Sequence, residues 1–186
     1  MIMGALGRCG SGAKDFTLKA GIADQDILKW DMAETAKGGP FEEILENEIF
    51  VNCIYLSKPI PPFLTKEMLE KDRKLSVICD VSCDATNPHN PIPVYFGATT
   101  FDNPLINIKT SVGYSLHFKT LQLTRFRQPV DVIAIDHLPT LLPREASDMF
   151  AKDLLPSLLA LKDRKSSSVW TDAEKLYHEK SATLRQ

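Results

Sequence analysis

Small residues recur near the amino terminus at the spacing of a dinucleotide-binding turn. In the segment GALGRCGSG, Ala5, Gly7 and Gly10 occupy the three small positions of a G-x-G-x-x-G pattern, with Gly4 and Gly12 as additional glycines. Small residues there let the chain turn tightly, let the backbone approach a pyrophosphate and let a helix pack closely on a strand. The amino terminus of that helix then presents unpaired N–H groups to the phosphates. Because the spacing alone is a weak signal, its meaning depends on the neighbouring elements.

An acidic residue follows at the distance expected of a ribose-binding carboxylate. Asp31 ends the segment DILKWD, roughly 20 residues beyond the turn, and a carboxylate in that place accepts hydrogen bonds from ribose hydroxyls and repels a 2′-phosphate. Since no arginine stands nearby to meet a 2′-phosphate, the sequence predicts NAD as the cofactor. The alternative interpretation is an ordinary surface aspartate after a strand.

Apolar runs alternate with helix-like stretches along the chain, which is typical of βαβ units and a mainly parallel sheet. We therefore expect an α/β protein with a Rossmann-like, doubly wound sheet. The segments that predict strands are MIMGAL, DILKWD, IFVNCIYL, LSVICDVS, LINIKT and VDVIAID. Only three residues precede the first glycine, whereas a strand usually has about 5 to 6. The first strand is therefore expected to be truncated.

Helices are predicted between these strands. The glycine turn should open a helix that stops at Gly21, and Thr65 should cap a helix that runs to Lys74. The proline-rich and asparagine-rich segment CDATNPHNPIP should be an ordered loop just beyond the carboxyl end of a strand, where α/β sheets bind ligands.

The carboxyl-terminal segment predicts two further helices. The first should break or end near Pro156, because proline removes a backbone donor inside a helix. The second should begin with a capping box formed by Thr171 and Glu174.

Composition excludes several classes of protein. Lys and Arg total 22 against 24 Asp and Glu, so no basic excess indicates nucleic acid. No apolar run approaches the roughly 20 residues of a membrane span, and the first residues lack the order of a secretory signal. We therefore expect a cytoplasmic protein that binds neither nucleic acid nor membrane. Cys9, Cys53, Cys79 and Cys83 lie in or beside apolar segments, so reduced structural thiols are expected and no metal ligand is assigned.

Several long blocks resemble the carboxyl-terminal half of the fungal, NAD-dependent, lysine-forming saccharopine dehydrogenases of the alanine dehydrogenase and transhydrogenase superfamily. These blocks are GALGRCGSGA, ILKWDMAET, GGPFEEI, FVNCIYLSKPIPPF, DVSCDATNPHNPIPVY and IDHLPTLLPREAS. The resemblance implies an oxidoreductase that acts on a CH–NH bond: it oxidises saccharopine with NAD and water to L-lysine and 2-oxoglutarate, the last step of the aminoadipate route to lysine. It also implies a small-molecule substrate and a monomer at full length.

The resemblance further implies roles for individual residues along the cofactor, from its phosphates through the adenosine ribose to the nicotinamide. The implied cofactor contacts are Gly7, Arg8, Asp31, Thr35, Tyr55, Val81, Ile135, Asp136, His137 and Leu138. The implied saccharopine contacts are Ser82, Cys83 and Asp84. Each has a structural alternative: Val81 and Ile135 also fit as buried strand residues, and His137 as a structural histidine. No catalytic residue is assigned.

The chain also departs from the family pattern. Family members carry an amino-terminal domain with a proton-transferring lysine and histidine, and that domain is expected to be missing here. Residues 1–142 should form the NAD-binding domain, and residues 143–186 helices that pack on the missing domain. Residues 113–128 have no counterpart in the pattern and are interpreted as an insertion, either a retained intron or a species-specific loop with a hairpin. The fragment alone is expected to be inactive; the alternative is a stand-alone NAD-binding module without its own catalysis.

Overall fold

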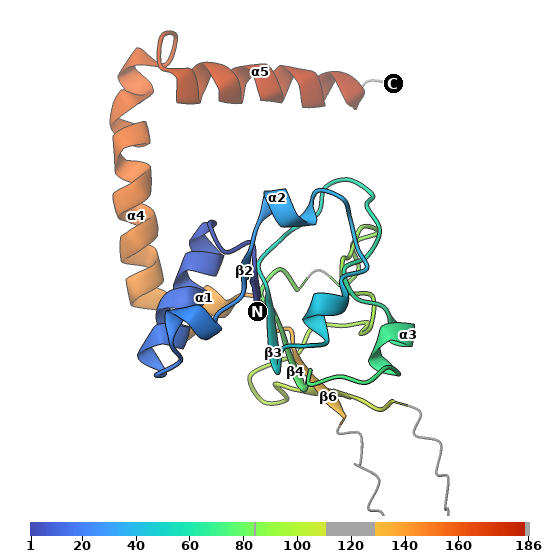
Figure 1. The fold of residues 1–186 in the computed structure, drawn as a ribbon. Coiled ribbons are helices and arrows are strands. Elements are labelled where there is room, and N and C mark those ends of the chain that lie inside the picture. The colour runs from blue at the N-terminus through green and yellow to red at the C-terminus, as the bar shows by residue number, and fades with distance from the viewer. Residues whose placement is uncertain (84, 111–128, 185–186) are drawn as a thin grey trace, which may run out of the picture. The chain divides into compact units, whose positions relative to one another are not determined.

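The computed structural model describes residues 1–83, 85–110 and 129–184, shown in Figure 1. The chain divides into two compact units, Met1–Asp136 and His137–Gln186. The predicted insertion at 113–128 lies outside the described residues. In the described part, no helix has the length and apolar character needed to cross a membrane.

One sheet organises the first unit. Its described strands have the order β2-β1-β3-β4-β6-β5, and each pair of neighbours is parallel except β5 and β6, which are antiparallel. The strands are β1 (Ile2–Met3), β2 (Lys29–Trp30), β3 (Ile49–Asn52), β4 (Val77–Asp80), β5 (Ile106–Ile108) and β6 (Val130–Ile133). The expected α/β fold with a mainly parallel sheet is confirmed.

The short strand β1 lies in the interior of the sheet. The Ile2 N–H donates to the Leu28 carbonyl at 2.8 Å on one side, and the Val51 N–H donates to the Met1 carbonyl at 3.0 Å on the other. From β1 the chain proceeds to β2 on one side and then to β3 on the opposite side. The strand order therefore reverses at β1 and β3, and such a reversal opens a ligand crevice in α/β sheets.

Apolar side chains of the strands and the loops between them build the core. Every second residue of β3, β4 and β6 is buried, and the residues between them are half-buried or exposed, so one face of the sheet carries the main core. The buried apolar residues pack with apolar side chains of the connecting segments in one cluster, whose largest members include Phe41, Ile44, Phe50, Phe63, Leu64, Leu69, Leu75, Ile78, Ile92 and Tyr95.

The helices of the first unit are short after α1. Helix α1 (Arg8–Lys19) is followed by Gly21 with φ 91°, which confirms the predicted helix and its stop. The remaining elements are the 3₁₀ helices Asp24–Asp26 and Glu42–Ile44 and the helices α2 (Met32–Thr35) and α3 (Lys66–Leu69).

Helix α3 ends earlier than predicted. Thr65 stands at its N-cap without a side-chain cap hydrogen bond, and the helix ends at Leu69 instead of reaching Lys74. The reason is a tertiary contact: the Lys74 N–H donates to the Leu45 carbonyl at 2.8 Å. That donor is therefore used in joining the approach to β4 to the segment before β3, and it cannot continue the helix.

The second unit consists of helices. They are the 3₁₀ helices Leu138–Leu141 and Ala160–Asp163 and the α-helices α4 (Pro143–Leu159) and α5 (Ser168–Thr183). Helix α4 continues through Pro156 without a break and ends three residues later, which agrees with a predicted end near the proline. The predicted capping box is wrong, because Ser167 is the N-cap of α5 and the Thr171 hydroxyl donates to the Ser168 carbonyl inside the helix at 3.2 Å.

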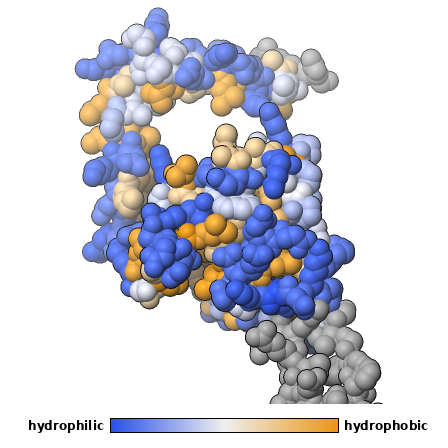
Figure 2. All heavy atoms as spheres, viewed as in Figure 1, coloured by the Kyte–Doolittle hydropathy of each residue, from blue (hydrophilic) through white to orange (hydrophobic). Residues whose placement is uncertain are grey.

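Neither long helix of this unit has a buried residue. Apolar side chains are interspersed with polar ones along both, as Figure 2 shows. The large apolar side chains exposed on α4 and α5 are Met149, Phe150, Leu155, Leu158, Leu159, Val169, Leu176 and Tyr177.

Candidate functional site

Four turns leave the carboxyl ends of parallel strands at the same edge of the sheet. They are residues 4–7 after β1, 53–55 after β3, 81–83 after β4 and 134–136 after β6. Ligands of open α/β sheets bind at this edge, beside the point where the strand order reverses. Most of the sequence-predicted site residues that the structure describes in the first unit lie in these turns or in the elements that follow them, whereas Asp31 and Thr35 follow β2.

The glycine turn is shaped by a close approach of backbone to backbone. A Cβ atom on Gly10 would lie 2.0 Å from the Gly4 carbonyl oxygen and 2.7 Å from the Cα atom of Ala5. Gly4 has φ 82°, and a Cβ atom there would lie 3.0 Å from Cγ1 of Ile54. Only glycine fits at these two positions, whereas Gly12 has open space around it. The fold therefore requires the close packing that the fingerprint predicts for its third small position.

The amino terminus of α1 is suited to an anion. Gly7 is its N-cap in an extended conformation and provides no side chain to cap the first N–H groups. The first turn contains no acidic residue, and it begins with the exposed Arg8. Unpaired N–H groups, the positive end of the helix dipole and a cation are the features that hold phosphate groups at helix amino termini.

Asp31 lies directly against this turn. Its Oδ2 accepts from the Leu6 N–H at 2.9 Å, and its Oδ1 accepts from the Met32 N–H at 2.9 Å. It is the N-cap of α2 and forms a capping box with Glu34, whose carboxylate accepts from the Asp31 N–H at 2.8 Å. In that capping box the Asp31 side chain also accepts from the Glu34 backbone, and a carboxylate has about four acceptor positions, so capacity remains for a further donor such as a hydroxyl.

Three further predicted cofactor contacts differ from one another in exposure and in hydrogen bonding. Thr35 is buried, and its hydroxyl donates to the Asp31 carbonyl at 2.8 Å, so this group is already used within α2. Tyr55 is 63% exposed at the turn after β3. Val81 is half-buried, and its N–H donates to the Asn52 carbonyl at 2.9 Å.

The turns after β4 and β6 approach each other. Sγ of Cys83 lies 4.0 Å from Oδ1 of the exposed Asp136, and half-buried Ser82 precedes it in the chain. Ile135 is half-buried and pairs with Thr99 in an isolated parallel bridge.

Three of the predicted residues cannot be assigned to this edge. His137, in a left-handed conformation with φ 59°, and Leu138 begin the second unit. Asp84 lies outside the described residues.

A buried polar cluster at this edge has no counterpart in the sequence-based prediction. It consists of Asn52 at the end of β3, Asp80 at the end of β4 and Tyr95 in the loop beyond, which are 0%, 3% and 2% exposed. Oδ1 of Asp80 accepts from Nδ2 of Asn52 at 2.9 Å, and Oδ2 accepts from the Tyr95 hydroxyl at 2.7 Å. The available signal was a polar residue ending each of two apolar strands, in IFVN and VICD.

Two cysteines near the site are poorly reactive. Burial raises the pKa of the Cys53 thiol to about 12 and also raises the pKa of the Cys79 thiol. Both are therefore protonated at neutral pH, and the thiol form is a poor nucleophile. Cys9, in the first turn of α1, is exposed. All four cysteines are free, as expected for reduced thiols.

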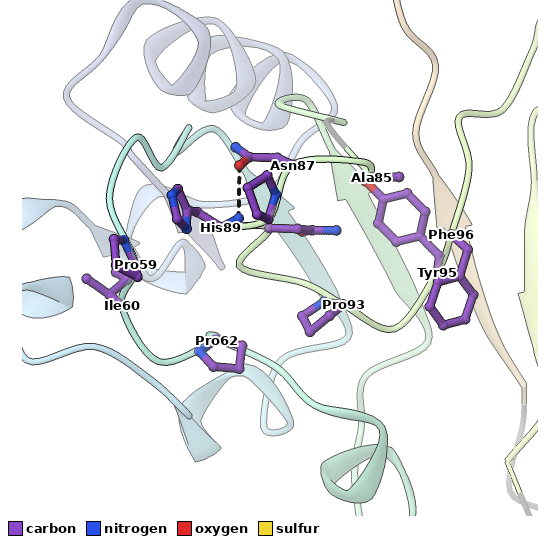
Figure 3. A pocket seen from close by; sticks show the side chains of 11 residues that line it. Pro59, Ile60, Pro62, Ala85, Asn87, His89, Pro93, Tyr95 and Phe96 are labelled. Atoms are coloured by element: carbon purple, nitrogen blue, oxygen red, sulfur yellow. Dashed lines mark hydrogen bonds between the residues drawn. The ribbon is translucent and has the colours of Figure 1, made fainter.

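A small pocket lies beside the cluster, between the loops that follow β3 and β4. Figure 3 shows it lined by side chains from residues 59–62 and 85–96, and its volume is about 280 Å³. The half-buried His89 contributes to the lining, and its N–H donates to Oδ1 of Asn87 at 2.9 Å. Nδ2 of Asn87 donates to the Leu56 carbonyl at 3.0 Å, so this asparagine connects the two loops.

Comparison with known proteins identifies close relatives. No protein-family model matches the chain. It is 56% identical over 185 residues to a saccharopine dehydrogenase (NAD+, L-lysine-forming) of Candida albicans, an alignment that covers 99% of this chain and 45% of the relative. Proteins of the same name from Schizosaccharomyces pombe and Emericella nidulans are 56% and 54% identical over 95% and 100% of this chain, and 45% and 47% of their own length is covered.

The chain thus spans a little under half the length of these curated relatives, and nearly all of its residues align with them. Identity of this degree along nearly the whole chain agrees with the blocks noted in the sequence. Over the part that it spans, the chain belongs to the NAD+-dependent, L-lysine-forming saccharopine dehydrogenase family.

Proposed function

We propose that this chain is the NAD+-binding part of an enzyme that oxidises saccharopine with NAD+ and water to L-lysine and 2-oxoglutarate. One observation carries the proposal: in a chain 56% identical to an enzyme of that name, the glycine turn packs backbone to backbone against α1 while Asp31 accepts a hydrogen bond from the same turn. This combination is the local architecture that holds a dinucleotide.

The residues at this edge fit the cofactor. The backbone at Gly7 and the guanidinium of Arg8 would hold the phosphates, because both stand at the uncapped start of α1. Asp31 would accept from the adenosine ribose with the acceptor capacity that the backbone N–H groups of Leu6, Met32 and Glu34 leave open. Bound NAD+ supplies the acceptor for the hydride of the substrate.

The turns on the other side would hold the rest of the cofactor and the substrate. Tyr55 and Val81 would border the adenosine and central part, and Ile135 and Asp136 the nicotinamide half; a cofactor role for His137 and Leu138 stays a prediction from the sequence. Ser82 and Cys83, together with Asp84, would contact saccharopine. Half-buried Ser82 and Cys83 at the end of β4 suit a contact that excludes water from one side of a ligand.

The helical second unit would pack against the part of the enzyme outside these 186 residues. The exposed apolar side chains of α4 and α5 support this role, because a packed partner would remove their apolar area from water. The structural division falls between Asp136 and His137, inside the region expected to form the first domain. The assignment of residues 1–142 to cofactor binding and 143–186 to packing remains our proposal.

Cofactor binding is tested by titrating NAD+ and NADP+ into the chain by calorimetry. We expect NAD+ to bind and NADP+ to bind at least about tenfold more weakly, because the Asp31 carboxylate repels a 2′-phosphate. Asp31→Asn keeps an acceptor oxygen at the N-cap and removes the charge, so it should reduce the preference for NAD+ over NADP+. Asp24→Asn is the matched control, because Asp24 is a carboxylate that pairs with Lys14 and Lys29 at 3.2 and 2.7 Å. Equal affinity of the wild-type chain for both cofactors would contradict the proposal.

Turnover is a separate question. We attribute proton transfer to a lysine and a histidine in the part of the enzyme that this chain does not span, because the chain covers 45% of a curated relative. General acid–base groups of this kind contribute about 10² to 10⁴ in rate. We therefore propose that the 186-residue chain alone produces no NADH from saccharopine above the blank, and that the missing half of the enzyme restores the reaction. Saccharopine-dependent NADH absorbance at an enzyme-like rate from the chain alone would refute this.

A further inference from the structure

We propose that Asp80, together with Asn52 and Tyr95, is a positioning residue that sets the ligand-facing turns after β3 and β4; the part of this inference that concerns affinity rests on the proposed NAD+ site. The three side chains come from three separate segments and are almost fully buried. Burial of polar groups is unfavourable unless they are hydrogen-bonded, so such a cluster is stable only in one arrangement.

The cluster holds the turn after β4 through Asp80. In addition to its bonds with Asn52 and Tyr95, Oδ1 of Asp80 accepts from the Cys83 N–H at 3.2 Å. Cys83 has φ 28°, in the left-handed region that residues with a Cβ atom rarely adopt. Backbone strain of this kind persists only where the surroundings enforce it. The Asp80 carboxylate is the group that bonds this N–H, so it maintains the turn that presents Ser82 and Cys83.

The turn after β3 is held through Asn52. Its Oδ1 accepts from the Ile54 N–H at 3.2 Å, and its Nδ2 donates to the Ile54 carbonyl at 3.3 Å as well as to Asp80. Ile54 in turn borders the glycine turn, because its Cγ1 would lie 3.0 Å from a Cβ atom on Gly4. A change in this cluster would therefore reach the turns on both sides of the cofactor crevice.

Tyr95 connects the cluster to the loop that carries His89. The tyrosine ring lines the pocket of Figure 3, while its hydroxyl donates to Asp80. This hydroxyl is the best atom to remove in a test, because Tyr95→Phe keeps the ring packing and deletes one hydrogen bond to the carboxylate. The matched control is Ser76→Ala at the opposite end of β4. The Ser76 hydroxyl also joins the β3 and β4 segments, by donating to the Glu48 carbonyl at 3.1 Å.

The experiment measures amide hydrogen exchange at residue resolution and NAD+ affinity for wild type, Tyr95→Phe and Ser76→Ala. We expect Tyr95→Phe to speed exchange of the Cys83 and Ile54 amides, to leave the Val132 amide of β6 unchanged, and to weaken NAD+ binding about tenfold. We expect Ser76→Ala to leave the exchange rates of these three amides and the NAD+ affinity near wild type.

The two proposals fail in different ways. If wild type binds NAD+ and Tyr95→Phe matches Ser76→Ala in exchange and affinity, the positioning role is overturned while the cofactor site stands. If wild type binds no NAD+, the proposed function is overturned, and the exchange data alone decide the role of the cluster: faster Cys83 exchange in Tyr95→Phe supports it, and unchanged exchange overturns it.

Discussion

The two sides of the ligand edge are built by opposite means. At the β1 turn the shape depends on atoms that are missing, because a Cβ atom on Gly10 would lie 2.0 Å from a backbone oxygen. At the β3 and β4 turns it depends on side chains that are present, because Asp80 accepts hydrogen bonds from Asn52, Tyr95 and the Cys83 N–H. We therefore expect added side-chain atoms to disrupt the β1 turn, and the loss of side-chain atoms to disrupt the β3 and β4 turns.

The largest effect is expected where an atom is added to the glycine side. Gly10→Ala should destabilise the chain by about 3 kcal/mol or more and abolish NAD+ binding, because backbone at both Gly4 and Ala5 blocks the new methyl group. Urea unfolding followed by circular dichroism measures the change.

Gly12→Ala is the control, because nothing lies within 4 Å of its added Cβ atom. The higher helix propensity of alanine should make this variant more stable by about 0.5 to 1 kcal/mol. Similar unfolding curves for the two variants would contradict the close packing of α1 on the turn.

A smaller but clear effect is expected from a removal on the other side. Asp80→Ala should cost about 2 to 4 kcal/mol, because it removes the buried oxygens that accept from the Tyr95 hydroxyl and the Cys83 N–H, and one of the two acceptors of Asn52 Nδ2. Asp131→Ala, which removes a carboxylate paired with Asn107 on the sheet surface, should cost no more than about 0.5 kcal/mol. Equal losses of unfolding free energy in Asp80→Ala and Asp131→Ala would contradict a larger contribution from the buried hydrogen bonds of Asp80.

The cysteines report on the two sides separately. Cys9 lies in α1 beside the glycine turn and is exposed, whereas Cys53 is half-buried in the turn after β3, with its pKa raised to about 12. With iodoacetamide at pH 8, Cys9 should react first, and NAD+ should slow its reaction because the cofactor phosphates would lie nearby. Peptide mass spectrometry follows each site. Faster labelling of Cys53 than of Cys9 would contradict this predicted order of reaction.

The smallest effect concerns alkaline pH. Because burial raises the pKa of Cys53 in the folded state, the folded chain binds more protons than the unfolded chain between roughly pH 8.5 and 12. Its contribution to stability is complete below that window and is lost as the pH rises through it. Thermal unfolding at pH 8 and pH 10 should therefore show a slightly smaller alkaline decrease for Cys53→Ala than for wild type. The half-exposed thiol keeps the difference small.

The same contrast explains how much the sequence could predict. The helix after the glycine turn and the close packing at Gly10 depend on neighbours within a few residues, and both were expected. The Asp80 cluster joins residues that are 28 and 15 positions apart, so no local pattern reveals it. Long-range contacts also caused the error at α3, where Lys74 bonds to Leu45. The capping box of Asp31 and Glu34 follows the local pattern D-x-x-E, but it was not predicted.

The strand β1 has a consequence for how the molecule opens. The segment around it bonds through the N–H groups of Ile2, Gly4 and Ala5 to the β2 side, and through its Met1 and Met3 carbonyls to the β3 side. These few hydrogen bonds of β1 therefore connect β2 to the rest of the sheet. We expect them to break in local opening events before the chain unfolds globally. A dinucleotide held by Asp31 after β2 and by the turns after β3 and β4 would contact the sheet on both sides of β1. Bound cofactor would therefore oppose this local opening by as much free energy as it adds against global unfolding.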